Sequence, residues 1–364
     1  MFETSGDSAE LLSDASLMVG LGQLDEAEET LVLLLRRADA AEDDDLASRA
    51  YEGLGTIATR RGRETRAREL FERAVERGGE PDPAERPWLY LELSRVLSSV
   101  GEPQQSAALL EWALKRLGES GDIAILARFT TFLSYALADQ GEYGRANAVL
   151  SELLRDHAED IDEMMRSRVN YALTRLSHNT GRTDQAVVYG ERALTAALAS
   201  GDAGLIFDCH MLAAGTQLDA GNTGRAQELL RGARAAVGAY SPSDVDMGFL
   251  LIEEARCALQ QDDREAARER ALEAVDLLGD MSMPGLYGLA QLALARVREA
   301  DGDPDRADRA YRAAIEGLRR QNGWNTDLAK AYRRYGKFLR SQGRDSLALE
   351  MLENASDLLP GNSA

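Results

Sequence analysis

The chain has 364 residues, a formal net charge of −20 and a sequence pI near 4.7, which argues against general nucleic-acid binding and against binding to anionic membranes. Hydrophobic residues make up 44% of the sequence, enough for a folded core, yet no stretch approaches the roughly 20 apolar residues of a membrane span. The first residues lack a basic start and an apolar core, so we expect a cytoplasmic protein. Cys209 and Cys257 form neither a disulfide framework nor a metal motif.

The predicted elements are helices along the whole chain. Residues 1–8 are small and polar, and we expect them to be disordered. A helix follows from about Ala9 to Val19, and the next, Asp25–Ala40, has acidic residues in its first turn, where the helix dipole favours them. The acidic connector Glu42–Asp45 leads to another helix pair, and the chain continues in this way to a last helix at Asp345–Leu359.

One pattern recurs in these helix pairs with a period of about 40 residues: a turn residue, then one small residue and, further on, a second. The turns fall at Gly22, Gly62, Gly101, Gly141, Gly181, Gly221, Asp262, Gly302 and Gly343. The first small residues are Ala27, Ala67, Ser106, Ala146, Ala186, Ala226, Ala267, Ala307 and Ala348. The second set is Ala74, Ala113, Ala193, Ala233, Ala274, Ala314 and Ala355, with Leu34 and Leu153 as exceptions.

Such a period is typical of a solenoid, and the small residues explain how its helices pack. Paired helices approach within about 8–10 Å only where the side chains at their crossing are small. The pattern therefore predicts an all-α chain whose residues 1–364 form a single superhelical domain.

The pattern resembles the tetratricopeptide repeat family, whose motif has an aromatic residue and Leu-Gly in the first helix, a turn glycine, and two alanines in the second helix. One repeat matches at Tyr51, Leu54, Gly55, Gly62, Ala67 and Ala74, and another nearly as well at Tyr332, Gly336, Gly343, Ala348 and Ala355. The period exceeds the usual 34 residues of the family, as in the longer repeats of bacterial regulators. The resemblance implies a right-handed α-solenoid of about nine helix pairs, with the first helix of each pair lining a concave groove.

The position six residues before each turn should then face that groove. In chain order these residues are Ser16, Thr56, Arg95, Tyr135, Arg175, Gly215, Arg256, Arg296 and Lys337. Five of the nine are basic although the chain is strongly acidic. Two clusters extend this row: Arg168, Tyr171, Arg175, His178 and Asn179 in the fifth unit, and Lys330, Arg333, Lys337 and Arg340 in the ninth.

These residues predict a concave ligand-binding site made of Arg95, Arg168, Tyr171, Arg175, Asn179, Arg256, Arg296, Lys330, Arg333, Lys337 and Arg340. Arginine binds carboxylates through two parallel hydrogen bonds, so an acidic peptide or a free carboxylate would suit the site. An alternative is that the bases neutralise nearby acids, because Glu253 precedes Arg256 and Glu299 follows Arg296 at helical spacing.

No catalytic motif stands out: the sequence has no phosphate-cradling glycine loop, no HExxH and no nucleophile elbow. We therefore expect a non-enzymatic scaffold or sensor with no cofactor and no metal. Its partner would be a protein or peptide, and a second copy of the chain, bound through a terminal repeat, is a further candidate partner. The alternative function is small-molecule sensing within a bacterial transcription regulator complex, which the resemblance suggests.

Overall fold

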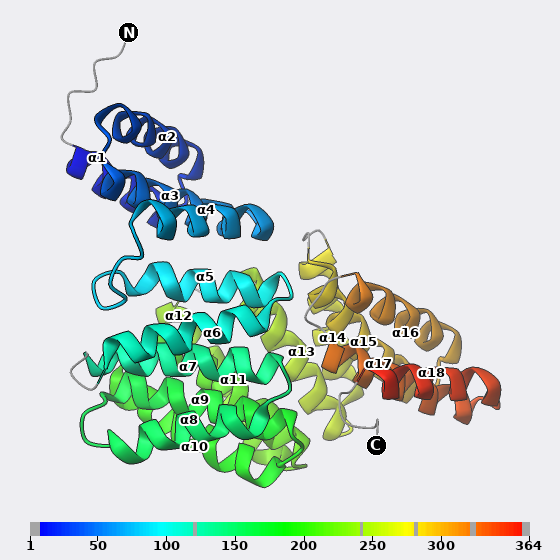
Figure 1. Ribbon diagram of the computed structural model, residues 1–364. Helices are drawn as coiled ribbons and strands as arrows, with labels where there is room; N and C mark the ends of the chain where they lie inside the picture. Colours follow the sequence, from blue (N-terminus) through cyan, green and yellow to red (C-terminus); the bar gives the residue numbers. More distant parts are fainter. Residues whose placement is uncertain (1–7, 119–121, 241–242, 280–282, 321–324, 359–364) are drawn as a thin grey trace. The chain divides into compact units, whose positions relative to one another are not determined.

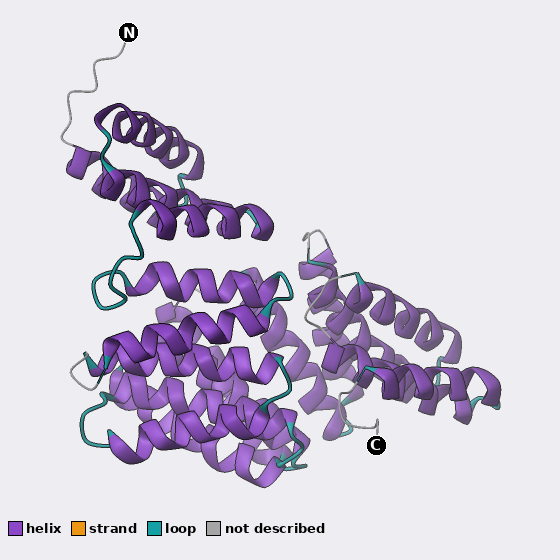
Figure 2. Cartoon of the chain, in the orientation of Figure 1, coloured by secondary structure: helices purple, strands orange, loops and turns teal. Residues whose placement is uncertain are grey.

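The computed structural model describes residues 8–118, 122–240, 243–279, 283–320 and 325–358. Within these ranges the chain forms eighteen α-helices. Figures 1 and 2 show their arrangement, with helices and loops but no strand in the described residues. The prediction of an all-α solenoid of nine helix pairs is confirmed. Ser8 begins the first helix, and residues 1–7 of the segment predicted to be disordered lie outside the described residues.

The chain separates into two compact units, Met1–Ile161 and Asp162–Ala364, and the prediction of one continuous superhelical domain stays a prediction. The first unit contains α1 (Ser8–Gly20), α2 (Leu24–Ala41), α3 (Asp44–Arg60), α4 (Glu64–Arg77), α5 (Pro87–Ser99), α6 (Pro103–Leu117), α7 (Ile123–Asp139) and α8 (Tyr143–Asp156). The second contains α9 (Glu163–Asn179), α10 (Thr183–Ser200), α11 (Ala203–Asp219), α12 (Thr223–Tyr240), α13 (Asp244–Gln260), α14 (Arg264–Gly279), α15 (Pro284–Ala300), α16 (Pro304–Arg319), α17 (Asn325–Ser341) and α18 (Asp345–Asp357).

Every predicted turn residue adopts the left-handed backbone conformation that ends the first helix of its pair. At Gly62, for example, φ is 67°. The amide of Gly62 donates to the carbonyl of Thr59, and that of Arg63 donates to the carbonyl of Ala58. This pair of bonds satisfies two carbonyls at the helix end. Among the nine turn residues, only Asp262 adopts this conformation with a side chain, at φ 59°.

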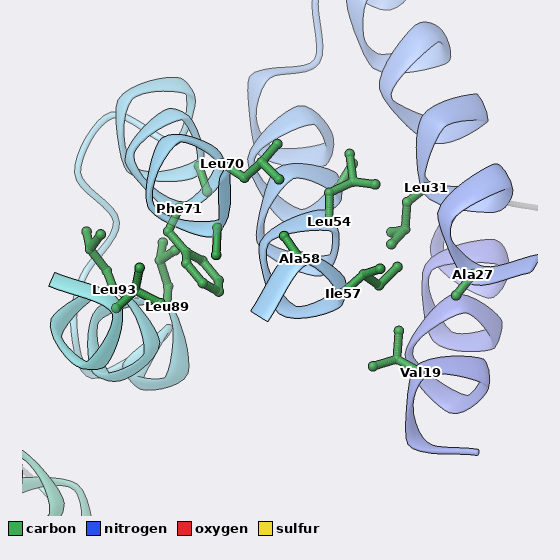
Figure 3. Close-up of a cluster of buried hydrophobic side chains, with 14 of the residues drawn as sticks. Val19, Ala27, Leu31, Leu54, Ile57, Ala58, Leu70, Phe71, Leu89 and Leu93 are labelled. Atoms are coloured by element: carbon green, nitrogen blue, oxygen red, sulfur yellow. The ribbon is translucent and has the colours of Figure 1, made fainter. Parts of the chain in front are cut away.

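The two sets of small residues lie where the helices cross. All nine residues of the first set are at most 1% exposed, and the second set, including its two leucines, is at most 4% exposed. In the first unit this packing forms the hydrophobic cluster of Figure 3, in which Phe71 of α4 is fully buried. A Cβ at Gly55 of α3 would lie 2.8 Å from the Phe71 ring. The glycine of the repeat motif therefore makes room for an aromatic side chain of the next helix.

The odd-numbered helices form the inner row of each unit. In the second unit α9, α11, α13, α15 and α17 pack one against the next in this order, and each also packs against the even-numbered helix that follows it. Each even-numbered helix packs against the helix before it and, where another helix follows in the same unit, against that next helix as well. None of the nine residues that precede the turns by six positions is buried, and all nine lie on odd-numbered helices.

None of the helices in the described ranges combines the length and the apolar character that crossing a bilayer would require.

Candidate functional site on the inner helices of the second unit

The predicted site residues fall into three groups. Arg95 lies on α5 in the first unit, and Arg168, Tyr171, Arg175 and Asn179 lie along one face of α9. The other six residues lie on α13, α15 and α17, which belong to the second unit together with α9. They are Arg256, Arg296, Lys330, Arg333, Lys337 and Arg340.

Two of the predicted arginines are neutralised by acids. Arg256 of α13 donates to Glu253 and to Asp219 of α11, each at 2.7 Å. The Glu253 carboxylate, followed by Asp219, raises the pKa of Arg256 and holds it charged. Arg95 is paired in the same way, 3.0 Å from Glu92 in the first unit. For these two side chains the neutralising interpretation accounts for the contacts.

Arg296 of α15 is different. It makes no ion pair within the described residues, although Glu299 follows it by one helical turn. The Glu299 carboxylate instead accepts a hydrogen bond of 2.6 Å from the hydroxyl of Tyr311 on α16. Burial lowers the pKa of Arg296, and the charges of Arg334 and Arg256 lower it further, while the Glu253 charge opposes them in part. The chain therefore holds a half-buried guanidinium among other cations.

Helix α17 carries five cations on one face, which we call the α17 basic face: Lys330, Arg333, Arg334, Lys337 and Arg340. All five are exposed, while the opposite side of the helix buries Tyr335, Phe338 and Leu339. Lys330 lies 3.5 Å from Asp327, and the other four make no ion pair within the described part of the chain.

Arg334 belongs to this face although the site predicted from the sequence does not include it. The position six residues before the turn and its cluster select Arg333 and Lys337. The spacing of Lys330, Arg334 and Lys337 at i, i+4 and i+7 would have placed Arg334 on the same face. Its charge reaches Arg296 on the neighbouring inner helix and lowers the pKa of that side chain.

His178 connects three of the inner helices. Its Nδ1 lies 3.3 Å from Oδ2 of Asp219 on α11, and its Nε2 lies 3.3 Å from Nζ of Lys330 on α17. Burial lowers the pKa of His178, and Lys330 lowers it further. A neutral imidazole with its proton on Nδ1 satisfies both neighbours, because Nδ1 then donates to Asp219 and Nε2 accepts from Lys330.

The face of α9 is more balanced in charge. Arg168, Arg175 and Asn179 are exposed, and Tyr171 is half-buried. Arg168 lies near Asp208 of α11, whose pKa burial and the Asp246 charge raise to about 6 despite the opposite effect of Arg168. This end of the inner row thus combines carboxylates with its cations.

The same residues offer little for metal or thiol chemistry. No group of three or more histidine, cysteine or acidic side chains in the described ranges could hold a metal ion. Both cysteines are buried, and burial raises the pKa of the Cys209 thiol to about 11, which keeps it protonated. The arrangement instead provides a set of cations that can bind a negatively charged ligand.

The turns, the small residues at the crossings and the inner row of helices define the class of the protein, an α-solenoid of stacked helix pairs. Residues 49–176 match the family model described as "Tetratrico peptide repeat". Over these residues the chain is similar to tetratricopeptide repeats, in agreement with the resemblance. None of the curated proteins matches the sequence.

Solved structures show the same fold at low sequence identity. The apo form of RapI superposes with a TM-score of 0.58 at 18% identity, covering 74% of this chain and 96% of RapI. NprR in complex with its cognate peptide NprX has a TM-score of 0.56 at 13% identity, covering 85% of this chain and 88% of NprR. A Rap protein complexed with Competence and Sporulation Factor has a TM-score of 0.56 at 14% identity, covering 96% and 88% of the two chains. At these identities the likeness shows the fold alone.

Proposed function

We propose that the protein is a cytoplasmic, non-catalytic binding protein whose inner helices in the second unit take up an acidic peptide or protein segment. The fold supports this proposal because NprR of similar fold was solved with its cognate peptide NprX, and a Rap protein was solved with Competence and Sporulation Factor. The proposal carries peptide binding over to this chain. The acidic nature of the ligand rests on the charges of this chain alone.

The observation that carries the proposal is that the half-buried guanidinium of Arg296 has no ion pair within the described residues. A half-buried guanidinium without a carboxylate costs free energy, and the charges of Arg334 and Arg256 add to this cost. Glu299 is available one turn away but is held by the Tyr311 hydroxyl. A carboxylate of a ligand would accept two parallel hydrogen bonds from the guanidinium of Arg296 and would reduce the repulsion between the cations.

The α17 basic face provides further cations, along one helix, for a negatively charged ligand. Four of its five cations have no ion pair within the described residues, and their exposure leaves them accessible. Gly215 on α11 has no side chain, and a Cβ there would meet only the Glu253 carboxylate, at 4.0 Å. A ligand can therefore approach the backbone at this point. We infer that the ligand carries several carboxylates, or an acidic side chain next to a free C-terminus.

Fluorescence anisotropy with a labelled peptide of alternating glutamate and alanine tests the proposal, with the glutamine counterpart as the reference peptide. We expect the acidic peptide to bind the wild-type protein and to bind Arg296→Gln and Arg334→Gln about tenfold or more weakly, since each removes one charged contact. Affinity should fall with added salt. The glutamine peptide should not bind.

Arg192→Gln on the outer helix α10 makes the same change of charge in the same unit and serves as the control. It should bind the acidic peptide like the wild-type protein. If Arg192→Gln and Arg296→Gln lost the same affinity, the loss would follow from the net charge of the protein and not from the proposed site. Unchanged binding by Arg296→Gln would refute the proposed site.

The proposed assembly includes contact between two copies through a terminal repeat. On α18 the side chains of Leu347 and Leu349 are 41% and 57% exposed, and apolar side chains so placed favour association. Light scattering after size exclusion tests this contact: Leu349→Glu should shift a dimer to a monomer, and a wild-type monomer at high concentration would overturn it.

A further inference from the structure

A cavity of about 340 Å³, shallow and wide open to solvent, lies between α15 and α16, which pack side by side in Figure 1. Its walls are Gln291, Leu294 and Arg298 of α15 and Arg306, Arg309, Ala310 and Ala313 of α16. On α15 these residues recur at i, i+3 and i+7, and Arg296 lies on the opposite side of the helix. The cavity is thus separate from the inner surface to which we assign peptide binding.

The lining of this cavity is positively charged, in contrast to the balanced charges of the neighbouring helices. It is lined by three arginines and no carboxylate. Arg306 has a partner in Asp303, 3.5 Å away, whereas Arg298 and Arg309 form no ion pair with any residue that the structure describes. The neighbouring arginines of α14 and α16 are nearly all paired with acids: Arg264, Arg268, Arg270, Arg312, Arg319 and Arg320.

The rest of the lining is suited to a small organic molecule. Leu294 and Ala310 are buried, and the short side chains of Ala310 and Ala313 leave the volume open. The Gln291 amide is 8% exposed, and its Nε2 donates to the Tyr287 hydroxyl at 2.6 Å, which fixes its orientation. An apolar floor with a few fixed polar groups is a feature of small-molecule sites, and here one side of the bound molecule would stay in solvent.

We propose that this cavity is a second binding site, which takes a compact dianion with a small apolar part, of the phosphomonoester class. Arg298 and Arg309 provide two planar guanidinium groups, which bind phosphate oxygens through paired hydrogen bonds. Arg306 contributes a third, partly neutralised charge, so a doubly charged group matches the lining. The apolar part of the ligand lies against Leu294, Ala310 and Ala313. The site goes beyond the proposed peptide binding and makes the chain a sensor of a small anion as well.

Isothermal titration calorimetry of the whole chain with phenyl phosphate tests this site, with phenol and inorganic phosphate as partial ligands. We expect saturable binding of phenyl phosphate, weaker binding of inorganic phosphate and none of phenol, because the charge supplies most of the affinity and the ring adds apolar contact. The double variant Arg298→Gln/Arg309→Gln should lose at least about tenfold in affinity.

Two further variants make the outcome decisive. Arg319→Gln lies on the same helix outside the cavity and should bind phenyl phosphate like the wild-type protein. Ala313→Leu keeps every charge but fills the cavity, and it should abolish binding while circular dichroism stays unchanged. Equal affinity of the wild-type protein, the double variant and Ala313→Leu, or the absence of saturable binding to the wild-type protein, would overturn the proposal. Because none of these changes touches Arg296 or Arg334, acidic-peptide binding should persist in all of them.

Discussion

The Nζ atom of Lys330 on α17 lies 3.3 Å from Nε2 of His178 on α9, although 152 residues separate them in the sequence. The inner row of the second unit therefore curves so far that its first and fifth odd-numbered helices meet through side chains. Asp219 on α11 holds the other ring nitrogen of His178. Only a neutral imidazole can accept from the Lys330 ammonium, so this contact depends on the proton that His178 carries.

The first prediction concerns pH. The folded pKa of His178 lies below its ordinary value of 6.5. The unfolded chain therefore binds more protons as pH falls below about 6.5, and stability is lost until His178 is protonated in the folded state as well. His178→Gln, whose amide can donate to Asp219 and accept from Lys330 without titrating, should lose less stability between pH 7 and pH 5 in urea unfolding.

His210, whose pKa burial also lowers, is present in both proteins, so the comparison isolates His178. Identical pH profiles for the wild-type protein and His178→Gln would contradict this prediction.

The second prediction contrasts the two arginines that precede successive turns. Arg296→Met removes an unneutralised, half-buried charge and should leave stability unchanged or raise it by up to about 1 kcal/mol. Arg256→Met breaks the contacts with Glu253 and Asp219 and should cost about 1–3 kcal/mol, because two partly buried carboxylates lose their partner. Thermal unfolding measures both. A large loss of stability in Arg296→Met would show that its charge has a structural partner.

The third prediction concerns the crossing of α15 and α16. A Cβ on Gly317 would lie 2.5 Å from the carbonyl oxygen of Pro284 and 3.0 Å from the Cα of Gly288, and neither backbone atom can move aside cheaply. Gly317→Ala should therefore lower stability by about 1–3 kcal/mol, although alanine has the higher helix propensity.

Gly238 on α12 is the matched control, because a Cβ there meets nothing within 4 Å. Gly238→Ala should be neutral or raise stability by up to about 1 kcal/mol. Equal effects of the two changes in chemical unfolding would argue against so close a crossing.

The fourth prediction concerns the turn at Asp262, where a side chain adopts φ 59° and the other eight turns have glycine. Asp262→Gly should raise stability by about 0.5–1 kcal/mol, because glycine removes the strain of the left-handed conformation. The ion pair lost with Arg264 is 82% exposed on the aspartate side and is worth little. The reverse change, Gly302→Asp, should lower the unfolding midpoint, and the same sign for both changes would refute the argument.

Most of the fold could be predicted because its determinants are local. A left-handed backbone at the end of a helix favours glycine, and a close helix crossing requires a small side chain, so both appear in the sequence at a fixed period. The close contact of Gly288 with Gly317 was not predicted, since these glycines stand outside the repeated positions. The boundary between the two compact units near Ile161 also had no signal in composition or period.

The sequence by itself thus determined the helix pairs and their turns, and its resemblance to tetratricopeptide repeats indicated which helix of each pair belongs to the inner row. It could not distinguish Arg256 from Arg296, because each precedes a turn by six residues and each has a glutamate three residues away. The tertiary structure decided between them: Glu253 pairs with Arg256 together with Asp219 of α11, whereas Glu299 is taken by the Tyr311 hydroxyl of α16 and leaves Arg296 without an acid. The competing partners come from other helices, and helical spacing within one helix carries no information about them.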